Sequence, residues 1–71
     1  MSEEVTAPMS GSIWKINVKV GDQVKYEDEL LILEALKMEN PIYAPADGKV
    51  AEIRVSEGDD VEPNQVLIVI E

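Results

Sequence analysis

The sequence contains neither cysteine nor histidine. This excludes disulfides, metal sites built from thiolates or imidazoles, a cysteine nucleophile and the most common general base of enzymes. No apolar run approaches the roughly 20 residues of a membrane span, and the N-terminal stretch Met1-Ser2-Glu3-Glu4 is acidic where a signal peptide is basic. We therefore expect a cytoplasmic chain that has no catalytic residues, holds no metal and does not insert directly into a membrane.

Positive charge is also scarce, with six Lys and Arg residues against 15 Asp and Glu residues and a formal net charge of -9. The six basic residues are scattered along the chain. Proteins that bind the phosphate backbone of nucleic acids concentrate basic residues on one face. Nucleic acid is therefore not an expected partner.

The chain reads as two copies of one unit. When the sequence is shifted against itself by 37 positions, residues 7–34 align with residues 44–71 without a gap. The matched landmarks are Ala7-Pro8 with Ala44-Pro45, Gly11 with Gly48, Gly21-Asp22 with Gly58-Asp59, and Leu30-Leu31-Ile32-Leu33-Glu34 with Leu67-Ile68-Val69-Ile70-Glu71. A tandem repeat of this kind indicates a supersecondary unit that buries its apolar face against its copy. A chain of 71 residues has room for one small domain, which we expect over residues 1–71. Because a chain of this length buries only about 60% of its unfolded surface, the core must be dense and simple.

The spacing of turn signals favours an all-β fold. Such signals recur roughly every 8 to 12 residues, and no segment longer than about ten residues keeps a helical apolar period. We predict about eight short strands, with turns at Gly21-Asp22 and Gly58-Asp59. Pro41 cannot donate to a strand ladder, so the strand that contains it should lie at a sheet edge.

Alternation in residues 13–18 separates two strand faces. One face carries Ile13, Lys15 and Asn17, and the other carries Trp14, Ile16 and Val18. We predict that the face with Trp14 packs in the core.

The stretch Glu34-Ala35-Leu36-Lys37-Met38-Glu39 joins the two copies, and Lys37 lies near the midpoint of the chain. A two-residue hairpin turn favours Asn-Gly or Asp-Gly, because its central residues take positive φ. A hairpin at residues 35–38 would therefore have unfavourable turn residues. Local rules of this kind tend to fail at functional sites, so the stretch is a candidate site.

This combination of motifs resembles the biotinyl domains, or biotin carboxyl carrier modules, of biotin-dependent carboxylases and decarboxylases. The likeness covers nearly the whole chain. The landmarks, in the family's order, are Ala7-Pro8-Met9 with Gly11, Gly21-Asp22, the hexapeptide from Glu34 to Glu39, Ala44-Pro45 with Gly48, and Gly58-Asp59. The resemblance implies a flattened barrel-sandwich hybrid of two four-stranded antiparallel sheets related by quasi-twofold symmetry.

Lys37 matches the lysine that carries covalent biotin in this family, usually within Ala-Met-Lys-Met at a hairpin tip. The resemblance implies that a biotin protein ligase modifies Lys37 and recognises a hairpin that includes Ala35, Leu36 and Met38. It also implies that the domain carries carboxybiotin between a biotin carboxylase and a carboxyltransferase or decarboxylase. A separate ligase is expected, because a lysine amine is almost entirely protonated at neutral pH.

The sequence departs from the family pattern at two positions. Leu36 replaces the usual methionine before the lysine, which is a volume-conserving apolar exchange. Glu27 stands where the family often has glycine, so we expect a different or strained turn there. The gap-free repeat leaves no room for the protruding thumb of some bacterial acetyl-CoA carboxylase carriers, which indicates the thumbless type.

Two alternative functions remain open. A lipoyl carrier domain of a 2-oxoacid dehydrogenase or glycine-cleavage system is similar in fold and also modified on a hairpin lysine, but its lysine is typically flanked by Asp and Ala, so Met38 favours biotin. The chain could also be an unmodified barrel-sandwich interaction module. Glu34 and Glu39 are either solubilising charges or residues that help a ligase to position the hairpin.

Overall fold

A computed structural model describes residues 2–71 and contains two four-stranded β-sheets. In chain order the strands are β1 (Glu3–Thr6), β2 (Gly11–Ile16), β3 (Gln23–Val24), β4 (Glu29–Ala35), β5 (Met38–Tyr43), β6 (Gly48–Ile53), β7 (Asp60–Val61) and β8 (Val66–Ile70). All neighbouring strands are antiparallel. The predicted all-β fold of two four-stranded antiparallel sheets is therefore confirmed. Met1 lies outside the described residues.

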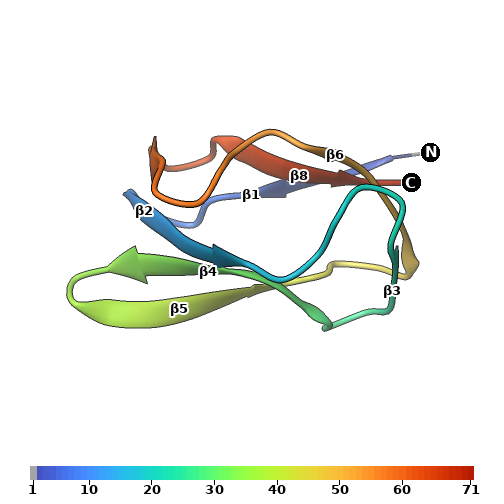
Figure 1. The fold of residues 1–71 in the computed structure, drawn as a ribbon, viewed down its shortest axis with the longest axis horizontal. Coiled ribbons are helices and arrows are strands. Elements are labelled where there is room, and N and C mark those ends of the chain that lie inside the picture. Colours follow the sequence, from blue (N-terminus) through green and yellow to red (C-terminus); the bar gives the residue numbers. More distant parts are fainter. Residues whose placement is uncertain (1) are drawn as a thin grey trace.

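The two sheets are built alike. One has the strand order β5-β4-β2-β7 and is called the hairpin sheet below; the other has the order β1-β8-β6-β3 and is called the terminal sheet. Strands β2, β3 and β4 begin 37 positions before β6, β7 and β8, respectively. The order of strands is therefore the same in both sheets once each strand is replaced by its counterpart, which is the quasi-twofold relation expected for the fold. Figure 1 shows the two sheets as facing layers.

The core fills the space between the sheets. Its largest fully buried side chains are Ile13, Leu30, Leu31, Leu33, Val50, Leu67, Ile68 and Ile70. No polar or charged side chain is buried among the described residues. An apolar core without polar networks suits a chain of this size, because every buried apolar group contributes to stability without a hydrogen-bonding requirement.

The turns before β3 and β7 form as predicted. Gly21 and Gly58 take positive φ values of 98° and 93°, a conformation that glycine adopts without steric cost. Asp22 accepts a hydrogen bond from the backbone N–H of Lys19 at 2.9 Å. Asp59 accepts the matching bond from the N–H of Ser56 at 2.8 Å. Each turn is thus closed by its own aspartate.

The prediction that Trp14 packs in the core is wrong. Ile13 is 1% exposed, whereas Trp14 is 51% exposed. Trp14 is the extra residue of a β-bulge, because Ile13 pairs with Leu33 while Lys15 already pairs with Ile32. The bulge interrupts the alternation of faces, so the isoleucine enters the core and the tryptophan points outward. The other two residues of the predicted face, Ile16 and Val18, do pack against the core.

The molecule is elongated, with extents of 32 × 17 × 17 Å. The turn between β4 and β5 lies at one end of the long axis, and both chain ends lie at the other end (Figure 1). Pro41 lies in β5, which is an edge strand, as predicted. Within residues 2–71 we find no helix with the length and apolar character needed to cross a membrane.

Candidate functional site

The turn between β4 and β5 consists of Leu36 and Lys37. Ala35 pairs with Met38 across the base of the turn. The φ values are 53° for Leu36 and 61° for Lys37, which are the positive values of a type I′ turn. This turn matches the twist of the strands, but neither residue is glycine or asparagine. The tip therefore holds local strain of about 1–2 kcal/mol per residue.

Two residues outside the turn support it. A Cβ atom on Gly11 would collide with the backbone carbonyl oxygen of Glu34, so only glycine lets β2 approach the base of the hairpin this closely. The side-chain amide of Asn40 donates hydrogen bonds to the carbonyl oxygens of Met38 at 3.1 Å and Leu33 at 3.3 Å. These contacts tie both strands of the hairpin together directly behind Lys37, so the strained tip rests on a fixed base.

The side chains at the tip are open to solvent. Lys37 is exposed, and its two apolar neighbours Leu36 and Met38 are 88% and 64% exposed. Ala35 points inward and is only 8% exposed. Large apolar side chains therefore lie exposed on both sides of the lysine.

Carboxylates flank the tip. Glu34 and Glu39 face each other across β4 and β5, one step behind the pair of Ala35 with Met38. Like charges placed directly opposite each other destabilise a sheet, so this pair is not explained by stability. Among residues 2–71 the ion pair found is that of Arg54 with Glu52, and Glu52 belongs to β6 of the terminal sheet. Lys37 thus keeps its amine unengaged between two acidic residues.

The arrangement can present a primary amine on a fixed support. An acyl group joined to this amine would extend into solvent without displacing any side chain of the domain, so the residues present fit a covalently attached group. No set of three or more Asp, Glu, His or Cys residues within the described chain could hold a metal ion.

The four residues predicted for the site, Ala35, Leu36, Lys37 and Met38, lie together in this one turn. Sequence reasoning missed the supporting roles of Gly11 and Asn40. The repeat of glycine at positions 11 and 48 was a usable signal for the first, because a glycine that recurs at the same place in both copies indicates a close approach of backbones. Asn40 gave no such signal.

Comparison with known proteins agrees with this geometry. A family model described as "Biotin-requiring enzyme" matches residues 3–70. The chain is 58% identical over 41 residues to the glutaconyl-CoA decarboxylase subunit gamma of Acidaminococcus fermentans, a match that covers 58% of this chain and 28% of that protein. It is 50% identical over 38 residues to the biotin/lipoyl attachment protein of Bacillus subtilis, covering 54% of this chain and 52% of the relative. The chain thus matches about half or less of the length of these relatives.

Among solved structures, the urea carboxylase of Kluyveromyces lactis contains a similar domain. It superposes with a TM-score of 0.95 and 35% sequence identity, covering 100% of this chain and 6% of that protein. A single-chain, multi-domain long-chain acyl-CoA carboxylase superposes with a TM-score of 0.90 at 24% identity, a likeness of fold alone. Both similar domains are therefore small parts of much longer chains.

Proposed function

Since this chain belongs to the family of biotin-requiring enzymes, we propose that Lys37 is the residue that carries covalent biotin. The chain is a biotin carrier domain of the kind found in biotin-dependent carboxylases and decarboxylases. One observation supports the assignment of the lysine above all others. Lys37 is exposed in a strained two-residue turn, between two exposed apolar side chains and at one end of the elongated molecule.

The domain acts by presenting the amine and does not catalyse a reaction. The type I′ turn fixes the direction in which the Lys37 side chain leaves the hairpin. Gly11 and Asn40 hold the base of that turn in place. Biotin, when attached, is a carrier of one-carbon groups. A tethered carrier raises the effective concentration of its cargo at each active site that it can reach.

The proposed partners are enzymes that act on the attached group. A biotin protein ligase presents biotin as an acyl adenylate. The neutral Lys37 amine attacks the acyl carbon, the amide C–N bond forms, the C–O bond to the phosphate breaks, AMP leaves, and the amine proton passes to solvent. A biotin carboxylase loads the carrier, and a carboxyltransferase or decarboxylase unloads it. The glutaconyl-CoA decarboxylase subunit and the urea carboxylase named above support this assignment, because their names describe such reactions.

Intact-mass measurement tests the attachment site. The domain is co-expressed with a biotin protein ligase, and we expect a single biotinyl increment on the wild type and none on Lys37→Arg. Lys25→Arg is the matched control, because Lys25 is also an exposed lysine next to a turn but lies outside the hairpin. A biotinyl increment that survives in Lys37→Arg would overturn the assignment.

The same measurement distinguishes a biotin carrier from a lipoyl carrier. The name of the Bacillus subtilis relative, a biotin/lipoyl attachment protein, mentions both groups. Co-expression with a lipoate ligase should leave the mass unchanged. A lipoyl increment on Lys37, with no biotinyl increment in the first experiment, would assign the domain to lipoyl chemistry. No increment with either ligase would favour an unmodified interaction module.

A further inference from the structure

The outer face of the hairpin sheet carries an exposed apolar patch. Leu31 and Leu33 of β4 are fully buried, so Ile32 between them points away from the core. Ile32 pairs with Pro41 on one side and with Lys15 on the other, and directly opposite residues share a face. The bulged Trp14 lies next to Lys15 and is 51% exposed. Trp14, Ile32 and Pro41 are called the Trp14 patch below.

The matching face of the terminal sheet is more acidic and serves as an internal comparison. In place of Pro41, Lys15 and Trp14, it has Glu4, Glu52 and Ala51, each 37 positions away in sequence. Val69, the counterpart of Ile32, keeps an apolar side chain between Glu4 and Glu52. Arg54 donates a hydrogen bond to Glu52 at 3.0 Å, and this contact, with a further contribution from Glu4, raises the pKa of Arg54. The fold therefore accepts a carboxylate at the position of Pro41 and a small side chain at the position of Trp14.

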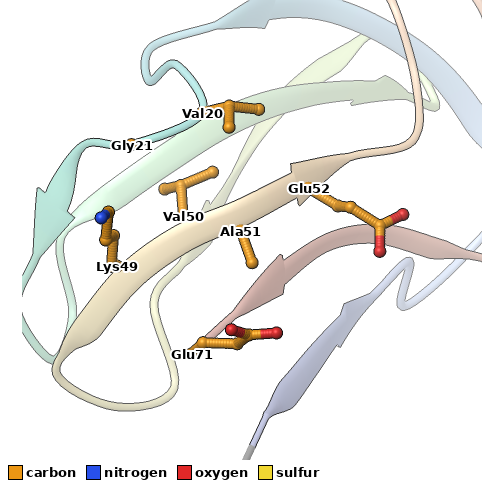
Figure 2. Close-up of a pocket in the computed structure, with 7 residues that line it drawn as sticks. All are labelled: Val20, Gly21, Lys49, Val50, Ala51, Glu52 and Glu71. Carbon is orange, nitrogen blue, oxygen red and sulfur yellow. The ribbon is translucent and has the colours of Figure 1, made fainter.

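Ala51, the counterpart of Trp14 in the terminal sheet, lies beside a cavity. A cavity of about 460 Å³ opens beside Ala51, lined also by Lys49, Glu52 and Glu71. Figure 2 shows Ala51 on β6 with the carboxylates of Glu52 and Glu71 on either side of it. Trp14 thus projects from one sheet at the position where a hollow lies beside Ala51 in the other.

Carboxylates surround the Trp14 patch. Toward the hairpin tip, Glu39, Glu34 and Ser12 lie in one row, which continues to Asp60. Toward the other end, Glu29 accepts a hydrogen bond from the side chain of Asn17 at 2.8 Å. Beside β2, Glu57 accepts one from the backbone N–H of Ile16 at 3.0 Å. Lys15 is the basic residue within the patch row, so the surroundings are predominantly negative.

We propose that the Trp14 patch is a docking surface for the biotin protein ligase, and that the contact surface of that ligase is an apolar pocket bordered by Lys and Arg residues. This inference rests on the proposed function of Lys37. An exposed tryptophan surrounded by polar groups has the properties of an interface hot spot. The acidic border selects a basic partner and steers its approach.

The reach of the lysine identifies the ligase as the occupant. An unmodified lysine has only a four-carbon stem, so the enzyme that modifies it must contact the body of the domain beside the hairpin. Enzymes that receive the longer biotinyl-lysine arm can remain further away. A second copy of the chain does not fit, because each copy carries a net charge of -9 and the same acidic border.

Two variants that copy the terminal sheet test the proposal. Trp14→Ala introduces the residue found at position 51, and Pro41→Glu introduces the residue found at position 4. Neither changes a core side chain, because both positions are exposed. Tyr26→Ala is the matched control, since Tyr26 is a 63% exposed aromatic residue that lies before β4, away from the hairpin tip.

Initial rates are measured with a purified biotin protein ligase over a range of domain concentrations. We expect Trp14→Ala and Pro41→Glu to lower kcat/KM by about tenfold or more, mainly through KM, while Tyr26→Ala stays within about twofold of the wild type. The wild-type rate should also fall as salt is added, because the acidic border attracts a basic surface.

Equal kcat/KM for the wild type and both patch variants would overturn the proposal, and this would leave the assignment of Lys37 intact. A wild type that accepts no biotin would overturn the proposed function instead. If Trp14→Ala does not fold, Pro41→Glu decides the outcome. Sedimentation velocity completes the test, because a wild-type dimer that dissociates in Pro41→Glu would assign the patch to self-association and contradict the ligase.

Discussion

Residues 7–34 and residues 44–71 place the same backbone features at matched positions. Trp14 and Ala51 are both bulged residues, Gly21 and Gly58 both take positive φ, and each half closes its turn with an aspartate. The residues that differ most lie on the outside. The comparison teaches that the shared positions build the core and the turns, whereas the exposed positions are free to differ between the two sheets.

The hairpin itself is the strongest contrast between the two sheets. β5 follows β4 through a two-residue turn, whereas β1, the counterpart of β5, is separated from β8 by the rest of the chain. The double variant Leu36→Lys with Lys37→Leu keeps composition and charge but moves the amine by one position. We expect biotinylation to slow about a hundredfold, because a displacement of about 1 Å at a reacting atom can have that effect. The free energy of unfolding should change by no more than about 1 kcal/mol, since both residues are exposed.

Initial rates with a purified ligase and urea unfolding check both parts of this prediction. The single variant Leu36→Met serves as control, because it restores the residue usual in the family and should retain the wild-type rate. Near-equal rates for the double variant and the wild type would mean that any exposed lysine at the tip suffices.

The two glycines at the starts of β2 and β6 offer the next contrast. A Cβ on Gly48 would lie 2.7 Å from the carbonyl oxygen of Glu71, and one on Gly11 would collide with that of Glu34. Gly11→Ala and Gly48→Ala should each lower the free energy of unfolding by about 1–3 kcal/mol, as overpacking does. Only Gly11→Ala should also slow biotinylation, because Glu34 belongs to the base of the hairpin. Urea unfolding and ligase rates below the unfolding transition test the pair. A rate lowered equally by Gly48→Ala would contradict the local role of Gly11.

The turns before β4 and β8 have the same backbone shape but different residues at the position with positive φ. Glu27 and Asn64 take φ values of 70° and 68°, and each donates its backbone N–H to an alanine carbonyl of the other half, at 2.9 and 2.7 Å. Asparagine tolerates this conformation better than glutamate does. Glu27→Asn should therefore stabilise the domain by about 0.5–1 kcal/mol, and Asn64→Glu should destabilise it by a similar amount. Thermal unfolding of both variants at one protein concentration measures the shifts. Shifts of the same sign would contradict this reading.

The smallest effect expected is that of biotin on the fold. The attached group should extend into solvent from Lys37, so hydrogen exchange of the modified and unmodified domains should differ only near residues 35–39. Amides of β4 and β8 should keep equal protection in both forms. Widespread loss of protection in the unmodified domain would show that the fold depends on the cofactor.

Much of this architecture could be predicted from the sequence, because its signals are local. The spacing of turn signals led to the all-β fold, the two Gly-Asp pairs to the turns and Pro41 to the edge strand, whereas the arrangement in two four-stranded sheets came from the family resemblance. The outward position of Trp14 could not be predicted, since a bulge depends on how two strands pair and leaves no mark on the alternation within one strand. The expectation of a strained turn at Glu27 was confirmed by its positive φ.

The supporting residues of the candidate site were harder to predict for the same reason. Gly11 permits a close approach to the backbone of Glu34, which belongs to another strand. The side-chain amide of Asn40 donates a hydrogen bond to the carbonyl oxygen of Leu33 on the neighbouring strand. The turn residues themselves were visible because they violate the preferences of a two-residue turn. Sequence reasoning therefore located the tip of the site but not what holds it.

The hairpin turn and the chain ends lie at opposite ends of the domain, so a rotation of the domain about its chain ends moves the turn over a long distance. The body is 32 Å long, and its ends leave from the side farthest from Lys37 (Figure 1). A label, a surface or a further polypeptide joined to either chain end would hold the domain at the end opposite the hairpin turn. If the domain rotated about that end, Lys37 would move along an arc whose radius is close to the length of the domain. The reach of any group on Lys37 is therefore set by the β-structure as well as by the flexible lysine side chain.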